Sequence, residues 1–323
     1  MRWSVATVVI GLTLLATSSQ AQQAAGDSLI LSSGVAQFRL ALGRIVLDPF
    51  HYKKVRLQAA LGNETEDEEF VCVTANRGTP SLHYLCQRGR CRVTIDTLDT
   101  NAVRIESTIE HPSGVIEHLL FDQPAAGAIR IASSFDGDKR QFKTNSLWHL
   151  MAEQPILFGQ QIKPVLSLIF DAERLQANAR EIEAHLKRQV IEQPRFTRAD
   201  VDKLVHQLGS KRRARRIDAY TQLRDFGVSV LPLLDEIDPE RLDLEQRHRI
   251  NELKKHFDHQ RNDTPARIAT WLSIDKAYWN ATCQNWSQSD RQAANDYLVT
   301  AWGDGLRDAG MTSVAETGQV DRQ

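Results

Sequence analysis

The sequence lacks most features that identify a specific chemistry. It has four cysteines and no CxxC pair, and it contains no GxSxG, HExxH, GxxxxGK[ST], GxGxxG or EF-hand pattern. Its 40 Lys and Arg residues against 41 Asp and Glu give a net charge of −1, so no charge excess favours nucleic acid or an anionic membrane. No apolar run reaches the ~20 residues that a membrane-spanning helix needs. We therefore expect no membrane span, no nucleic-acid partner, no cofactor, no metal and no catalytic residues.

The first 21 residues have the pattern of a secretory signal peptide. Arg2 supplies the positive start, residues 5–15 form a short apolar core, and Ser19-Gln20-Ala21 is a small-x-small cleavage site. No Cys follows the cleavage site, so a lipid anchor is not indicated. The sequence predicts an exported protein, periplasmic or extracellular, that is cleaved after Ala21. Residues 22–33 are small and polar, which is typical of a flexible N-terminus.

All four cysteines lie in the mature chain, where export permits disulfides. Cys86 and Cys91 flank a hairpin-like loop, and we predict a disulfide between them. Cys72 and Cys86 also lie symmetrically about the turn at residues 76–81, so the pairing stays open. A zinc site is disfavoured by the spacing.

Residues 34–170 are predicted to form an antiparallel β-rich domain with a closing helix. Residues 35–47 are compatible with a helix or a strand pair. From Tyr52 the apolar pattern has a period of two, and turn residues separate the segments. The candidate strands are 54–60, 69–75, 81–87, 90–96, 102–110, 115–121, 127–134 and 139–144. Short turns between successive strands favour a meander with one wet face. The apolar run at 165–170 is interpreted as part of a helix that covers the other face.

Residues 171–303 are predicted to be helical, beginning with a connector helix at 171–193. Thr197 and Asp200 form a capping-box-like start, and Thr264-Pro265 begins a later helix. The five aromatics Trp271, Tyr278, Trp279, Trp286 and Trp302 have helical spacing and are interpreted as core rather than as a binding platform. Residues 304–323 contain few apolar residues and are predicted to be a disordered tail.

Within this helical region, Leu208-Gly209-Ser210 predicts a helix stop followed by a helix cap. Ala214, Ile217, Tyr220, Leu223 and Phe226 then form one stripe, and the VLPLL segment at 230–234 opens another helix after Gly227. The LGS segment before a basic helix, the Ala219/Leu223/Gly227 spacing and VLPLL resemble HEAT-like α-solenoid repeats over residues of about 195–260. The resemblance implies a protein-interaction or scaffold surface, without catalytic residues. The predicted fold class is α+β, an antiparallel β-meander domain followed by an all-α HEAT-like domain.

Two charge runs and two groups of histidines are candidate sites. Residues 64–69 form an acidic loop, and a basic helix start, unfavourable for the helix dipole, comprises Lys211, Arg212, Arg213, Arg215 and Arg216. The basic run is the candidate patch for binding an anion or a partner, which includes docking of the acidic loop within the molecule. The alternative is ordinary solvated surface. His248, His256 and His259 lie near one helix face but lack a carboxylate or Cys to complete a metal site. His149 lies in an apolar context and is interpreted as a hydrogen-bonded core residue.

The leading hypothesis is an exported, non-enzymatic interaction or scaffold protein with an unknown protein partner. The alternative is an envelope carrier that holds a lipid or other small apolar ligand on the curved β domain. A hydrolase would require His149 to meet an acid and a nucleophile in one cleft.

Overall fold

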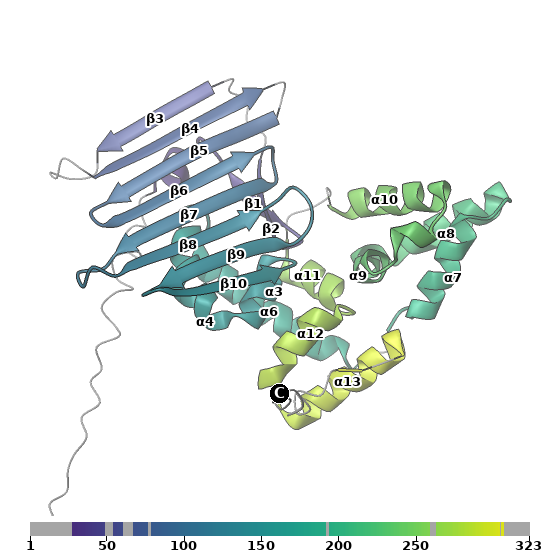
Figure 1. Ribbon diagram of the computed structural model, residues 1–323. Coiled ribbons are helices and arrows are strands. Elements are labelled where there is room, and N and C mark those ends of the chain that lie inside the picture. The colour runs from purple at the N-terminus through teal and green to yellow at the C-terminus, as the bar shows by residue number, and fades with distance from the viewer. Residues whose placement is uncertain are drawn as a thin grey trace, which may run out of the picture. The chain divides into compact units, whose positions relative to one another are not determined.

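The computed structural model describes residues 28–48, 54–60, 67–76, 79–191, 194–258, 263–303 and 305–306. Within these residues the chain is α+β, as predicted: an antiparallel eight-stranded sheet precedes most of the helices (Figure 1). The predicted signal peptide lies outside the described residues, as does almost all of the predicted tail.

The strands follow one another along the chain with short turns. They are β1 (Phe38–Ala41), β2 (Arg44–Leu47), β3 (Lys54–Ala60), β4 (Glu68–Asn76), β5 (Thr79–Arg88), β6 (Cys91–Leu98), β7 (Ala102–Glu110), β8 (Ile116–Gln123), β9 (Ile129–Phe135) and β10 (Asp138–Thr144). The eight strands from β3 to β10 therefore agree closely with the eight predicted segments.

The helices and short helical turns complete the chain. They are α2 (Leu29–Ser33), α3 (Leu147–Glu153), α4 (Pro155–Leu157), η2 (Phe158–Ile162), α5 (Lys163–Leu166), α6 (Ala172–Gln189), α7 (Arg198–Leu208), α8 (Arg213–Asp225), η3 (Gly227–Val230), α9 (Leu231–Asp235), η4 (Pro239–Arg241), α10 (Leu244–Asp258), α11 (Pro265–Leu272), α12 (Lys276–Thr282), η5 (Cys283–Asn285) and α13 (Gln288–Trp302).

The chain divides into two compact units, and each is made of separate segments. The β unit comprises Met1–Arg39, Ile45–Asn145 and Pro155–Glu173. The helical unit comprises Leu40–Arg44, Ser146–Gln154 and Arg174–Gln323. The predicted boundary at residue 170 would have assigned the first two segments of the helical unit to the β-rich domain.

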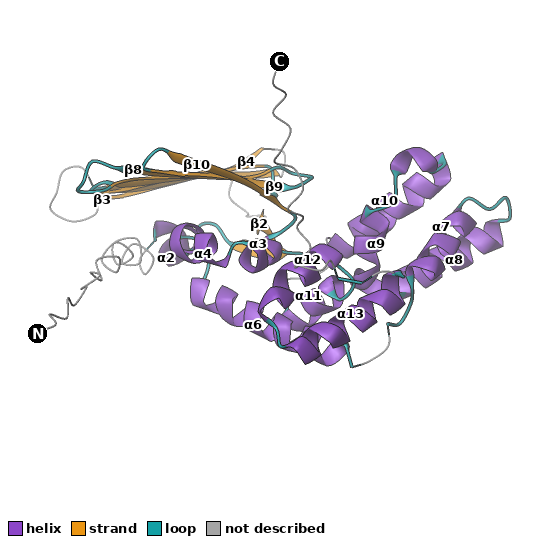
Figure 2. Ribbon diagram, turned by 60° about the horizontal axis from the view of Figure 1, so that its bottom comes forward, coloured by secondary structure: helices purple, strands orange, loops and turns teal. Residues whose placement is uncertain are grey.

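The main sheet of the β unit is a meander in which every strand pairs with its neighbours in sequence, in the order β10-β9-β8-β7-β6-β5-β4-β3. Alternate residues are buried, so each strand has an inner and an outer face. Val71, Tyr84, Ile95 and Phe121 on the inner face are at most 1% exposed. Within the unit, α2 and α4 lie on one side of the sheet (Figure 2), and Ile30 from α2 is fully buried. Helix packing thus buries one face of the sheet, as expected for a meander with one wet face.

The outer face of the sheet carries exposed charged pairs across neighbouring strands. His83 lies 2.6 Å from Asp96, and Arg130 lies 2.6 Å from Asp122. Opposite charges facing each other across strands are mildly stabilising, and exposed pairs contribute at most about 1 kcal/mol each. This face is therefore ordinary solvated surface.

The start of the described chain corrects the predicted flexible N-terminus. Residues Leu29–Ser33 form α2, and Ser28 caps it by accepting a hydrogen bond from the Leu31 amide. The Ser28 hydroxyl also donates to the carbonyl of Leu168 at 2.7 Å. Ile30 and Ser28 are both 0% exposed, so this short segment is ordered by two buried residues whose contacts lie far along the chain.

In the helical unit, α7–α8 and α9–α10 form two successive helical pairs. Arg216 of α8 contacts Glu245 of α10, and Tyr220 of α8 lies under Arg249 of α10. Residue numbers rise together on both helices at a constant offset of 29, so α8 and α10 run parallel. The first helices, α7 and α9, are also in contact.

The buried stripe of α8 differs from the predicted one. Ala219 and Leu223 are fully buried, whereas Ala214 and Ile217 are exposed. The predicted stripe advances by three residues, whereas the buried Ala219 and Leu223 are four residues apart. The face of α8 that packs against α7 is the one that carries Ala219 and Leu223. The first turn of α8 therefore stands in solvent.

Candidate interaction surface and buried polar clusters

Four cations of the predicted basic patch are exposed at the start of α8: Lys211, Arg212, Arg213 and Arg215. In the part of the chain that the structure describes, none of their charged groups has a hydrogen-bond or ion-pair partner. We call these four residues the cationic turn. It is a concentrated positive surface on a chain of nearly neutral net charge.

The fifth predicted residue, Arg216, has a structural role. Its side chain is half-buried, donates to the carbonyl of Ser210 at 2.8 Å and lies 3.6 Å from Glu245 of α10. The basic run thus divides into four exposed cations and one arginine that joins neighbouring helices.

The start of α8 also lacks the cap that the sequence suggested. The N-cap residue is Arg212, which makes no side-chain cap hydrogen bond. Ser210, the predicted cap, instead accepts from the Arg212 amide at 3.3 Å. Each cation at a helix N-terminus costs about 0.3–1 kcal/mol. Since no described acidic group offsets this cost, the cationic turn is unfavourable for folding alone.

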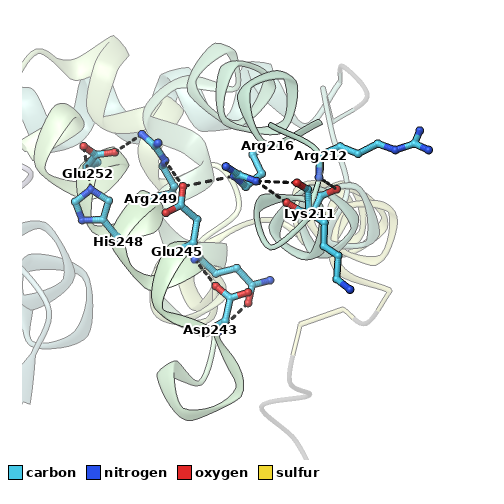
Figure 3. A network of polar contacts seen from close by, with 10 residues as sticks. Lys211, Arg212, Arg216, Asp243, Glu245, His248, Arg249 and Glu252 are labelled. Carbon is cyan, nitrogen blue, oxygen red and sulfur yellow. Dashed lines mark hydrogen bonds and ion pairs between the residues drawn. The ribbon is translucent and has the colours of Figure 1, made fainter. Parts of the chain in front are cut away.

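Behind the cationic turn, a chain of ion pairs connects α8 with α10 (Figure 3). Glu245 binds Arg216 and also Arg249 at 3.1 Å, and Arg249 binds Glu252 at 2.9 Å. The hydrogen bond to Glu245 is the largest influence that raises the pKa of Arg249. The carboxylates of this network are therefore already neutralised by Arg216 and Arg249, which leaves the cationic turn unopposed.

A second cluster brings His149 together with an acid and a hydroxyl. The Ser146 Oγ lies 2.8 Å from Nδ1 of His149, and Oδ2 of Asp275 lies 3.0 Å from its Nε2. A Ser, a His and an Asp meet as in a catalytic triad, but the two ring nitrogens are exchanged: Ser146 faces Nδ1 and Asp275 faces Nε2. Sequence reasoning did not find Ser146 or Asp275 as partners of His149. The ring of His149 also packs edge-on against Trp271 and Tyr278.

Burial and capping give this cluster a structural role. Ser146 and His149 are both 0% exposed, so a substrate does not reach the hydroxyl. Ser146 is the N-cap of α3, and Asp275 is the N-cap of α12, where it accepts from the Tyr278 amide. His149 therefore links the starts of two helices, which agrees with its interpretation as a hydrogen-bonded core residue.

The charge of Asp275 is stabilised by this link. Burial opposes its ionisation, but the hydrogen bond and charge of His149, with backbone N–H groups, lower its pKa overall. Burial also raises the pKa of Tyr278 to about 12, so its hydroxyl stays protonated. Removing His149 would leave a largely buried carboxylate without its side-chain hydrogen-bond partner.

A third cluster holds the β1–β2 turn within the helical unit. Asp263 accepts from the amides of Leu42 and Gly43, each at 2.7 Å, and from Trp148 Nε1 at 3.2 Å. Gly43 has a φ of +69°, and a Cβ there would lie 2.5 Å from the Trp148 ring. Burial raises the pKa of Asp263, although these donors and Arg267 partly offset it. Only glycine fits this turn, and the carboxylate fixes it.

Glu69 corrects the interpretation of residues 64–69 as a solvated acidic loop. It lies in β4 on the inner face and its side chain is 1% exposed. It accepts from Tyr84 Oη at 2.6 Å and from the Leu29 amide at 2.5 Å, with Arg88 at 3.4 Å. The carboxylate is thus an internal anchor for the α2 segment. Residues 64–66 lie outside the described residues.

The cysteines are free thiols in the structure. Cys86 is paired in register with Val93, and Cys91 with Arg88, so the two cysteines are diagonal neighbours on the inner face. Burial raises the pKa of both thiols, to about 11 for Cys91. Cys72 pairs with His83 on the outer face, which separates it from Cys86. The Cys86–Cys91 disulfide is not formed here and stays a prediction.

The remaining histidines and aromatics have ordinary roles. His248 pairs with Glu252 at 3.4 Å, and His259 lies outside the described residues. Within the described ranges, no three His, Cys, Asp or Glu residues are grouped so as to hold a metal. The five predicted core aromatics are at most 9% exposed, which confirms that they are core.

Comparison with known proteins gives no match: no family model, curated protein or solved structure matches this chain. None of the helices in the described ranges is both long and apolar enough to cross a lipid bilayer.

Proposed function

We propose that this is an exported, non-enzymatic interaction protein whose helical unit binds an acidic partner through the cationic turn. The observation that carries the proposal is the set of four exposed cations that have no described internal partner. They stand at the positive end of a helix, where they oppose folding, and an acidic partner would remove that cost.

The arrangement of the helices supports a HEAT-like scaffold. The parallel contact of α8 and α10 is the neighbour relation of second helices in successive helical pairs, at an offset of 29 residues that is shorter than the ~40–47 residues of a HEAT repeat. In such stacks the second helices form a continuous surface, and the cationic turn begins one of them. The two pairs are too few to be stable alone, and α11 packs next to α9 to extend them.

The alternative, an apolar-ligand carrier, receives less support. The inner face of the β unit is filled by the chain's own residues, since Ile30, Ile45 and Leu47 are all 0% exposed. A ligand would have to displace these segments. We therefore favour the interaction role.

A photo-crosslinking amino acid at Ala214, inside the cationic turn, tests the proposal. Expressed in the host of origin, the full chain should form a crosslink to an acidic protein, identified by mass spectrometry. Charge reversal of the four cations to Glu should abolish the crosslink, whereas Arg195→Glu, an exposed control in the same unit, should not. A crosslink that survives the reversal would contradict the proposal.

The predicted export is tested separately by N-terminal sequencing of the protein from its host. We expect the mature chain to begin at Gln22. Retention of Met1 would remove the argument for an exported partner.

A further inference from the structure

The sides of α8 and α10 that carry the exposed residues can be assigned from their contacts. At 100° per residue, Arg213 and Ile217 of α8 lie on one flank of the line of contact with α10, and the buried Ala219 lies on the other. On α10, Leu244 and His248 lie on one flank and the buried Leu253 on the other. Because the helices are parallel, the two exposed flanks lie on the same side of the pair.

We name this surface the outer strip: Arg213, Ile217, Leu244 and His248, continuing into the cationic turn. Ile217 is 51% exposed and Leu244 is 79% exposed. The contact of Arg216 with Glu245 sets Leu244 level with residue 215, so Ile217 is only about 3 Å farther along the axis. Two large exposed apolar side chains, Ile217 and Leu244, therefore lie on the same side of the helix pair as Arg213, next to the turn that carries Lys211 and Arg212.

We propose that the partner of the cationic turn is a protein segment that is both acidic and apolar, docked along the outer strip. This inference rests on the proposed function and specifies its partner. Carboxylates of the segment would pair with Lys211, Arg212 and Arg213. Its apolar side chains would cover Ile217 and Leu244.

The apolar pair distinguishes this partner from other polyanions. A nucleic-acid backbone matches the cations but offers Ile217 and Leu244 only polar, hydrated groups. An anionic bilayer accepts cations with apolar side chains beside them, so competition with anionic vesicles tests that occupant. Protein segments that dock on helical surfaces instead combine apolar anchors with a charged rim. The chemistry of the outer strip thus favours an acidic peptide segment of a partner protein.

The probe is a labelled, glutamate-rich helical peptide of about four turns with two leucines at i and i+4. Its binding to the full-length mature protein is measured by fluorescence anisotropy at low salt. A matched peptide has both leucines replaced by serine. Phosphatidylglycerol vesicles and a DNA duplex serve as competing polyanions.

Two variants separate charge from apolar contact. Ile217→Ser with Leu244→Ser should weaken binding of the leucine peptide about tenfold or more, and so should Lys211→Glu with Arg213→Glu. Acidic residues suit a helix N-terminus, so the charge variant should fold. Val299→Ser, an exposed apolar control on α13, and Arg195→Glu should leave binding unchanged.

Each of the following three results would overturn one part of the proposal. Equal binding of the serine peptide, with no effect of the Ile217/Leu244 variant, overturns the apolar anchor but leaves the charge-based proposed function standing. Vesicles or DNA that bind through the cationic turn while the leucine peptide does not would overturn the protein partner. Binding of every probe that is insensitive to charge reversal would overturn both proposals.

Discussion

At the scale of single residues, His149 is a fully buried side chain whose loss should be costly. His149→Ala removes the partner of the largely buried Asp275 carboxylate and leaves Ser146 Oγ without its contact to Nδ1. Leaving a buried carboxylate without its hydrogen-bond partner costs about 3 kcal/mol. Equilibrium denaturation at pH 7 should show a loss of this order. The exposed His206→Ala in the same unit is the control.

The cost of His149→Ala should also depend on pH in a definite direction. The folded-state pKa of Asp275 is lowered, so its stabilisation is complete above the ordinary carboxyl range, about pH 4, and is lost as the pH falls through the folded pKa. In the variant, burial without His149 no longer favours the carboxylate. The difference in unfolding free energy between wild type and variant should therefore shrink on acidification. A constant difference down to acid unfolding would contradict the assigned pair.

At the scale of elements, the turn between α7 and α8 depends on one close approach. A Cβ on Gly209 would lie 2.6 Å from Oδ2 of Asp243 and 3.1 Å from Nε2 of Gln246. These two side chains cap α10 reciprocally, and Gln246 also donates to the carbonyl of Val205 in α7. Displacing them would loosen α10 from α7.

Gly209→Ala should therefore lower the free energy of unfolding by about 1–2 kcal/mol, through overpacking and loss of the cap. Gly159→Ala is the matched control, because a Cβ there meets nothing within 4 Å. In a helical turn that substitution should be neutral or stabilising by about 0.5–1 kcal/mol. If denaturant unfolding shows that Gly209→Ala lowers the free energy of unfolding and Gly159→Ala leaves it unchanged or raises it, the close approach of Gly209 to Asp243 is supported. Equal changes in the two variants would refute it.

The extent to which sequence predicts this structure follows from the range of the interactions. Alternation of apolar residues is local, and it located the eight strands of the main sheet. The capping box of Thr197 with Asp200 is also local, and it is present in the structure. The exposed cations were likewise visible in the sequence. Local pattern was enough for elements and surface charge.

Contacts between residues far apart in the chain could not be predicted from sequence patterns. Asp275 lies 126 positions from His149, and no spacing rule connects them. Glu69 looked like part of an acidic loop, because its burial depends on Tyr84 and Leu29 from other elements. The stripe of α8 was wrong at Ala214 and Ile217, since the sequence did not indicate which flank α7 would cover. That error concealed the outer strip.

At the scale of the whole molecule, the helical unit is built from three separate stretches of chain. Residues Leu40–Arg44 and Ser146–Gln154 supply partners for carboxylates in the third stretch. Asp263 holds the amides of Leu42 and Gly43, and Asp275 holds His149. A fragment that starts at Arg174 keeps every helix from α7 onward but loses these partners.

Such a fragment, residues 174–323, should fail to fold cooperatively. Asp263 would lose the amides of Leu42 and Gly43 and the Trp148 N–H, Asp275 would lose His149, and α12 would lose its contact with α3. Tryptophan fluorescence is a specific monitor, because all five tryptophans after the predicted signal peptide belong to the helical unit. The full mature chain should give a sharp fluorescence transition in denaturant, whereas the fragment should give a broad one without near-ultraviolet circular dichroism. A fragment that unfolded as sharply as the full chain would show that its helices alone carry the stability, and that the two earlier stretches are dispensable to the surface we propose for binding.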